Sequence, residues 1–310
     1  MRRTAIAALL VGGLLVTGCG DDDAETADTD APPPADTSDD TSGDTGAPAA
    51  TAAPAGTDAA GLACADGKTL VDGELTIATG EPAFPPYVID DAPETGEGFE
   101  AAVAMAVARE MGFEGDAVKW IRTTFDAAIQ PGPKDFDFNL QQYTITPDRA
   151  EVVSFSDPYY TAAQAIFGLA DSPAADAATI ADLQGLKIGV QASTTSLTYV
   201  EEVIQPTSAP LVFNDNAAAK QALDGNQIDA IVADLPTALF ITAVEMEGTA
   251  VYGQIEGSGT DQFGLLLEKD NPLVECVNDA LAALTASGEL EAITTEWMAD
   301  YTEAPIITLT

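Results

Sequence analysis

The hydrophobic positions of this chain follow two alternating patterns beyond residue 70. Short apolar runs bounded by polar residues or glycine are typical of buried strands. Longer segments with apolar residues three and four positions apart are typical of helices that bury one face. These patterns predict strands at residues 75–78, 136–143, 165–169, 186–190, 228–233 and 263–267, and helices at residues 98–111, 196–203, 217–223, 236–244, 272–287 and 290–297.

Strands that alternate with helices predict an α/β fold, in which helices cover a largely parallel sheet. In such sheets, ligands bind in the crevice beyond the ends of the strands, where the connecting loops contact them. The residues that directly follow the predicted strands are therefore the first candidates for a binding site.

The first residues of the chain have a different pattern. Arg2 and Arg3 precede an apolar run at residues 5–16, which is too short to cross a bilayer and is typical of a signal peptide. The run ends at Gly18-Cys19, and small residues before a cysteine resemble the bacterial lipobox. This resemblance implies cleavage after residue 18 and attachment of lipid, palmitate included, to Cys19 on the outer face of the cell membrane. An ordinary signal peptide with a chance cysteine is the alternative.

Residues 19–66 consist mainly of Asp, Thr, Ala, Pro, Ser and Gly, with no Lys or Arg. They cannot bury enough apolar surface to offset the entropy of ordering, so they are predicted to form a disordered acidic tether. A flexible chain of this length spans roughly 40 Å. The tether would let the folded part stand off the membrane, and that part is long enough for one large domain or two lobes.

Charge and composition exclude several functions. The formal net charge of −40 argues against binding to nucleic-acid backbones. It fits either a solubilising surface or a field that attracts cationic solutes. The chain has no histidine, which excludes Ser-His and Cys-His catalysis and the usual His/Cys metal sites. We therefore expect no cofactor, no metal and no enzymatic activity.

The chain has three cysteines. If Cys19 carries lipid, Cys64 and Cys276 remain outside the cell, where disulfides persist. An even remainder favours a Cys64–Cys276 disulfide over two free thiols.

Two candidate anion sites follow predicted strands. Thr144 and Arg149 lie just beyond residue 143, and an arginine fork matches a carboxylate with two charge-assisted hydrogen bonds. Thr194 and Thr195 open a predicted helix, whose exposed amides favour anions. The alternatives are a surface arginine after a turn and ordinary helix capping.

A candidate cation site and an aromatic wall complete the pattern. Asp234 follows a predicted strand and can pair with an ammonium group, or cap the helix that begins near Pro236. Residues 81–87 combine aromatic residues with prolines, which predicts a rigid apolar wall or a core-packing loop. These sites together suit an α-amino acid, which presents one carboxylate and one ammonium group.

At these residues the chain resembles a known family, the solute-binding proteins of polar amino-acid ABC importers, called family 3. The most specific match is residues 143–149, continued by residues 152–160. The resemblance covers about residues 70–298, with weaker matches in the expected order at residues 98–100, 186–195, 228–234 and 288–297.

The resemblance implies a type II periplasmic-binding-protein-like fold, with two α/β lobes joined by two crossover strands and closing on the ligand. It places lobe 1 at residues 67–160 and 263–310, lobe 2 at residues 165–253, and hinge segments at residues 161–164 and 254–262. It implies a monomer that captures a polar amino acid and delivers it to the permease subunits of an ABC importer.

The resemblance also implies roles for individual residues. Arg149 would grip the α-carboxylate, helped by the hydroxyl and amide of Thr144 and by the backbone amides of Thr194 and Thr195. Asp234 would take the α-ammonium group. The side chains expected nearest the rest of the ligand are Phe84, Tyr87, Phe125, Glu81, Gln191 and Gln142.

Two departures from the family pattern leave undetermined which amino-acid side chain the site accepts. Gln141 and Gln142 replace the usual small residues, and the loop at Glu81 is one residue longer than in some members. Glu81 and the negative charge favour a neutral-polar or cationic side chain over a glutamate-type one.

Two rival functions remain. A cyclohexadienyl-dehydratase-like enzyme has the same fold and needs a general acid or base, which Glu81 could supply. The expected pairing of Asp234 with an amino group argues instead for a bound zwitterion. A ligand-presenting sensor subunit would use the same site.

Overall fold

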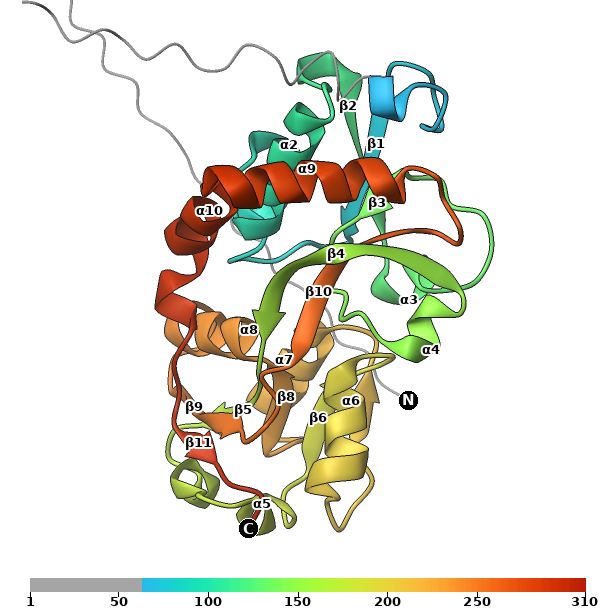
Figure 1. Ribbon diagram of the computed structural model, residues 1–310. Coiled ribbons are helices and arrows are strands. Elements are labelled where there is room, and N and C mark those ends of the chain that lie inside the picture. The colour runs from blue at the N-terminus through green and yellow to red at the C-terminus, as the bar shows by residue number, and fades with distance from the viewer. Residues whose placement is uncertain (1–62) are drawn as a thin grey trace, which may run out of the picture. The chain divides into compact units, whose positions relative to one another are not determined.

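The computed structural model describes residues 63–310 (Figure 1). The predicted signal peptide, the lipobox cysteine Cys19 and most of the predicted tether lie outside the described residues. Within residues 63–310, no helix has both the length and the apolar character needed to cross a membrane.

The first lobe is built on a mixed five-stranded sheet. Three neighbouring strands, β2, β1 and β3, run parallel, and β10 runs antiparallel between β3 and β4. The strand order is β2 (Val118–Thr123), β1 (Leu75–Gly80), β3 (Phe138–Asn139), β10 (Asp261–Glu268) and β4 (Val153–Ala162).

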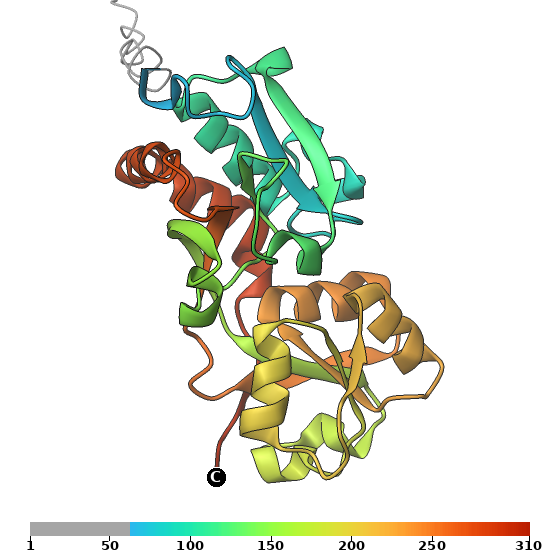
Figure 2. The same cartoon turned by 90° about the vertical axis from the view of Figure 1, so that its right-hand side faces the viewer.

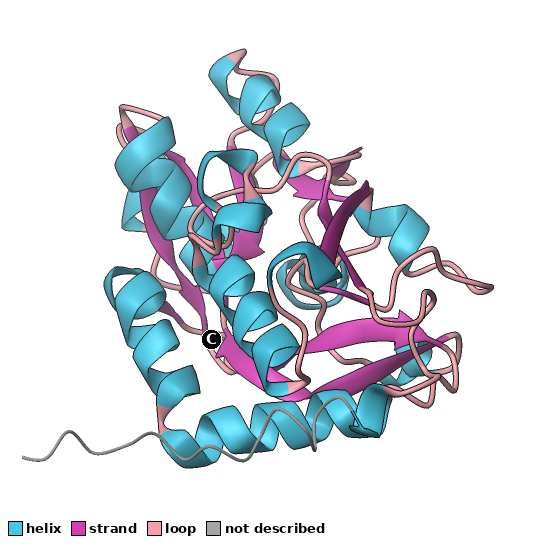
Figure 3. Ribbon diagram, turned by 90° about the horizontal axis from the view of Figure 1, so that it is seen from above, coloured by secondary structure: helices cyan, strands magenta, loops and turns pink. Residues whose placement is uncertain are grey.

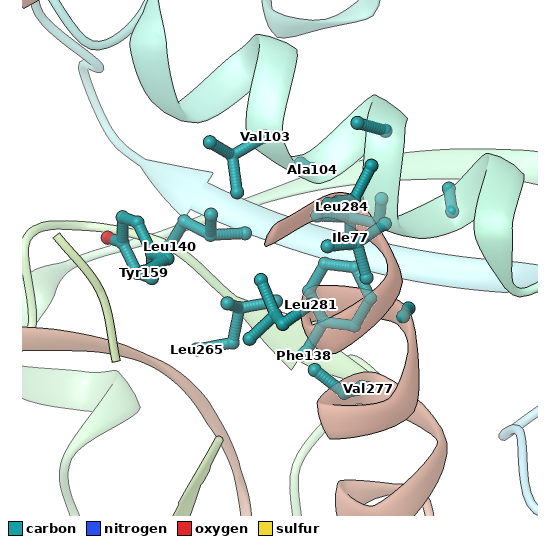
Figure 4. Close-up of a cluster of buried hydrophobic side chains, with 14 of the residues drawn as sticks. Ile77, Val103, Ala104, Phe138, Leu140, Tyr159, Leu265, Val277, Leu281 and Leu284 are labelled. Carbon is teal, nitrogen blue, oxygen red and sulfur yellow. The ribbon is translucent and has the colours of Figure 1, made fainter. Parts of the chain in front are cut away.

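Three long helices cover one face of this sheet: α2 (Phe99–Glu110), α9 (Val274–Ser287) and α10 (Glu289–Met298), which Figure 3 shows beside the strands. Figure 4 shows Ile77 and Phe138 of the strands packed among Val103 of α2 and Leu281 of α9, all buried. The helical spacing of the apolar residues in α2 and α9 therefore reflects one shared core.

The second lobe is built on a six-stranded sheet. Its central strand β5 runs antiparallel to both of its neighbours, β8 and β9, whereas β6 is parallel to β8 and β7. The strand order is β11 (Ile306–Ile307), β9 (Thr249–Ile255), β5 (Gln164–Leu169), β8 (Ala230–Asp234), β6 (Ile188–Gln191) and β7 (Leu211–Phe213).

Helices cover both faces of the second sheet. Successive side chains of β5 point to opposite faces, so neighbouring residues of this strand pack against different helices. Ile166 packs in the cluster that contains α5 (Ile180–Leu183) and the segment after α6 (Thr195–Tyr199). Phe167 packs in the cluster of α7 (Asn216–Asp224) and α8 (Leu235–Phe240). The remaining short helices are α3 (Phe125–Ala128), α4 (Pro147–Ala150), the 3-10 segments Ile89–Asp91, Pro93–Thr95, Gly115–Ala117, Pro173–Asp176 and Ala299–Tyr301, and the π segments Val200–Ile204 and Ile241–Glu245.

The chain passes between the two sheets more often than expected. It crosses at Ala163 between β4 and β5, and again between β9 and β10. A third passage follows α10, where the C-terminal segment reaches the second sheet (Figure 2). We expected residues 263–310 to lie wholly in lobe 1, but Ile306–Ile307 pairs with β9.

This C-terminal strand is held by both burial and hydrogen bonds. Ile307 is fully buried in the second lobe, and the Gln254 amide donates to the Pro305 carbonyl at 2.7 Å. Gly253 permits the approach, since a Cβ there would lie 2.6 Å from the Pro305 oxygen. Such pairing depends on a distant partner strand, so the local pattern of residues 302–310 does not reveal it.

Local patterns also missed several strands and misjudged their direction. β2, β4, β7 and β9 were not predicted, and the sheets are mixed rather than largely parallel. β4 contains Pro158 and several polar residues, which hides its strand pattern. The strand predicted at residues 136–143 shortens to Phe138–Asn139, and beyond it Gln142, with a φ of 53°, turns the backbone away from an extended path.

The predicted disulfide between Cys64 and Cys276 is present, with the two Cα atoms 5.7 Å apart. It joins the start of the described chain to α9. Ala65 beside it is buried in the first-lobe core, so the folded domain begins before the predicted tether boundary at residue 66.

Candidate functional site

All the predicted ligand-binding residues line one or both of two adjoining cavities. The larger cavity is about 330 Å³ and the smaller about 40 Å³, and both are lined by Phe125, Gln142 and Gln191. The larger one is also lined by Glu81, Phe84 and Tyr87, and the smaller one by Thr144, Arg149, Thr194, Thr195 and Asp234.

Arg149 is held rigidly at the smaller cavity. Its helix α4 begins with Pro147 and is capped by Thr146, whose hydroxyl accepts a hydrogen bond from the Arg149 amide at 3.2 Å. The guanidinium Nη1 donates to the Thr144 carbonyl at 2.7 Å, and Nη2 donates to the Ser193 carbonyl at 2.9 Å. These bonds fix the plane of the guanidinium and connect the two lobes.

The electrostatic surroundings of Arg149 suit an anion. Its guanidinium carbon lies 5.4 Å from the centre of the Phe125 ring, which itself stacks on Tyr143 at 4.7 Å. Burial lowers the pKa of Arg149, while Tyr143, Asp234 and Asp261 act in the opposite direction. An arginine remains protonated despite such a shift, so the cavity holds a partly desolvated cation.

The start of α6 faces Thr144 across this cavity. Thr194 caps the helix by accepting from the Leu197 amide at 3.2 Å, so the capping interpretation of this residue is correct. Thr195, the first residue of the helix, places its hydroxyl 3.4 Å from that of Thr144. Backbone amides at a helix start have no partner within the helix, so they remain available to an anion.

Asp234 belongs to a network that sequence reasoning did not find. Gln164 Nε2 donates to Asp234 Oδ1 and to Asp261 Oδ2, each at 2.7 Å. The Ser196 hydroxyl donates to Gln164 Oε1 at 2.6 Å, and the Thr195 hydroxyl donates to Asp261 at 3.0 Å. Gln164 therefore holds two carboxylates close together at the junction of the lobes.

The alternative role of Asp234 as a helix cap is not observed. It occupies the N-cap position of α8, but its side chain makes no capping hydrogen bond. Burial and then the charge of Asp261 raise the pKa of Asp234 to about 8, against the lowering effects of Gln164 and Arg149. A carboxyl group with this pKa is stabilised in its ionised form by an added cation.

A second buried carboxyl group shapes the larger cavity. Glu100 Oε1 accepts from the Gln142 amide at 2.7 Å, its Oε2 accepts from the Gln142 side chain, and the Tyr159 hydroxyl also donates to Glu100. Burial raises the pKa of Glu100 to about 7, although these hydrogen bonds lower it. Glu100 thereby holds Gln142 in its left-handed conformation at the cavity wall.

The predicted aromatic wall lines the larger cavity. The Tyr87 hydroxyl shares a hydrogen bond with the Thr237 hydroxyl at 3.2 Å, which joins the wall to α8. Phe84 lies beneath Lys220, whose Nζ is 5.7 Å from the ring centre. Both Phe84 and Tyr87 therefore line the cavity, rather than only packing in the core.

Sequence reasoning missed Gln164, Asp261 and Glu100 for different reasons. Glu100 lies in the segment 98–100 that matched the family pattern, but no role was assigned to it. Gln164 and Asp261 are the first residues of β5 and β10. Each follows a point where the chain crosses between the sheets, and this position was the only signal that could have identified them. In residues 63–310, no cluster of three His, Cys, Asp or Glu side chains could hold a metal ion.

Two similar proteins of known function are amino-acid-binding proteins. The L-cystine-binding protein TcyJ of Escherichia coli K12 is 29% identical over 232 residues, covering 72% of this chain and 82% of TcyJ. The ABC transporter arginine-binding protein 1 of the same organism is 28% identical over 227 residues, covering 69% of this chain and 86% of that protein.

A solved structure shows the same fold. The ancestral amino acid-binding protein AncCDT-1, described as a precursor of cyclohexadienyl dehydratase, has a TM-score of 0.60 and 30% identity. The alignment covers 73% of this chain and 95% of that one. Residues 75–300 match the model of one family, and the chain belongs to it: the bacterial extracellular solute-binding proteins, family 3.

Proposed function

We propose that this protein binds the zwitterionic part of an amino acid between Arg149 and Asp234 and delivers the amino acid to an ABC importer. The observation that carries the proposal is that a guanidinium and a buried carboxyl group line one small cavity, although Arg149 and Asp234 are 85 positions apart in sequence and in different lobes. Its relatives among the amino-acid-binding proteins of ABC transporters support the same function.

The carboxylate end of the site has spare hydrogen-bond donors. A guanidinium carries five N–H groups, and Arg149 commits one from each Nη to a carbonyl group. The remaining N–H groups, with the Thr144 hydroxyl and the amides at Thr194 and Thr195, would hold the α-carboxylate. The α-ammonium group would then reach Asp234, where its charge offsets the desolvation of that carboxylate.

Ligand binding and lobe closure would be one equilibrium. The bonds from Arg149 to Ser193 and from Tyr87 to Thr237 join residues of the two lobes at the cavity rim. A ligand that touches both lobes favours the closed form by its extra contacts there. The closed form is what the permease subunits would recognise.

Several finer features belong to the same proposal. The signal peptide, the lipid on Cys19 and the tether would hold a monomer at the outer face of the cell membrane. The first lobe would comprise residues 67–160 and 263–298, with the second lobe at residues 165–253 joined by the C-terminal strand Ile306–Ile307.

A thermal-shift screen against the common amino acids tests the function. A ligand at a hundred times its Kd stabilises the folded protein by about 2.7 kcal/mol. We expect a clear rise in Tm with at least one amino acid and none with prephenate, and no turnover of prephenate or arogenate. A flat response to every amino acid, or turnover of either ring compound, would contradict the proposal.

A further inference from the structure

The wall of the larger cavity contains acidic side chains and no basic ones. Among its lining residues are Glu81, Glu100, Asp126 and Asp215, and the lining includes no lysine or arginine. Arg149 lines only the smaller cavity, at the end proposed to hold the α-carboxylate. The space left for the rest of the ligand is therefore acidic.

These four carboxyl groups are not equally available. Glu100 is occupied by Gln142 and Tyr159, and Asp215 caps α7 by accepting from the Ala218 amide at 2.7 Å. Glu81 and Asp126 have no side-chain hydrogen bond and no ion pair with any other residue in 63–310. Both line the cavity from the first lobe, at the end of β1 and in α3.

Two further cations contact residues of this wall, and both have other partners. Arg122 Nη1 donates to the Gly80 carbonyl at 2.9 Å and pairs with Asp91 at 2.7 Å. Lys220, above Phe84, pairs with Glu245 at 2.6 Å. Neither cation lines the larger cavity, so the charge of Glu81 and Asp126 is not balanced by the protein there.

We infer that the bound amino acid has a positively charged side chain, which lies in the larger cavity near Glu81 and Asp126. This inference rests on the proposed function. The aromatic rings of Phe84, Tyr87 and Phe125 line the same cavity, and such rings attract a cation at their faces. An acidic side chain would instead face four carboxyl groups and no free cation.

The test compares L-arginine with L-citrulline, which has nearly the same shape but no charge. Calorimetry on the wild-type protein is expected to show arginine binding at least about tenfold more tightly, because two ion pairs at a partly exposed wall are lost with citrulline. The double variant Glu81→Gln/Asp126→Asn should reduce this arginine-to-citrulline ratio to about two or less.

A matched control separates this effect from the general charge of the surface. Glu94→Gln removes one exposed carboxylate that lies outside the cavity, and it should leave the arginine-to-citrulline ratio unchanged. A ratio near one in the wild type, or a ratio that survives the double variant, would overturn the inference.

The outcomes also separate this inference from the proposed function. If L-glutamine or L-cystine binds and arginine does not, the amino-acid function holds and the cationic side chain is wrong. If no amino acid binds, the proposed function itself fails. L-lysine serves as the second cationic probe and should bind more tightly than L-glutamine.

Discussion

Replacement of Arg149 by alanine is the most direct test of the proposed site. The wild-type guanidinium donates to the Thr144 and Ser193 carbonyls at 2.7 and 2.9 Å and packs on Phe125. The variant would leave the α-carboxylate of the ligand without its cation in a desolvated cavity. Truncating one partner of such a pair costs about 2–5 kcal/mol, which corresponds to a Kd about 30-fold to a few thousandfold weaker.

The assay is calorimetry with the amino acid that stabilises the wild type most. Arg149→Lys should restore only part of the lost affinity, because an ammonium group cannot reproduce the planar fork. Arg109→Ala is the matched control: it removes an arginine of α2 that pairs with Glu289 of α10 at 2.8 Å and that lines neither cavity. Binding by Arg149→Ala within twofold of wild type would refute the placement of the carboxylate.

Three further predictions concern stability. The pKa of Asp234 is raised from its ordinary value of 3.8 to about 8, so the ligand-free folded state holds a proton that the unfolded chain releases between those pH values. The free energy of unfolding should therefore fall as pH rises from about 4 to 8. Asp234→Asn should flatten this dependence on pH, as measured by thermal unfolding. An unchanged dependence would count against the raised pKa. Removing the disulfide with Cys64→Ser/Cys276→Ser opens a loop with a sequence separation of 212 and should cost up to about 5 kcal/mol in urea denaturation, whereas alkylation of two thiols in native protein would show that the bond is absent. Ile307→Ala removes a fully buried side chain from the second lobe and should cost about 2–4 kcal/mol, and a loss below about 0.5 kcal/mol would mean that the C-terminal strand is not seated there.

The α/β class followed from local sequence features, and the candidate site residues from those features together with the family resemblance. Apolar periodicity reports which side chains are buried, and it correctly predicted α2, α9 and the buried strands β1, β5 and β8. Arg149 and Asp234 became candidates because both lie in segments that follow predicted strands, at the edge of a sheet where ligands bind, and the family resemblance implied their roles. The Cys64–Cys276 bond was predicted because two cysteines remain after Cys19 and because disulfides persist outside the cell, not from any local pattern.

Only the tertiary structure decided how those residues are held and what surrounds them. Gln164 and Asp261 are 97 positions apart, and their hydrogen bond exists because two crossings of the chain meet beside Asp234. The strand Ile306–Ile307 likewise acquires its structure from β9, since a short apolar pair gains its burial and backbone hydrogen bonds only from a distant partner. Periodicity registers whether a side chain is buried, but it carries no information about which polar groups burial brings together.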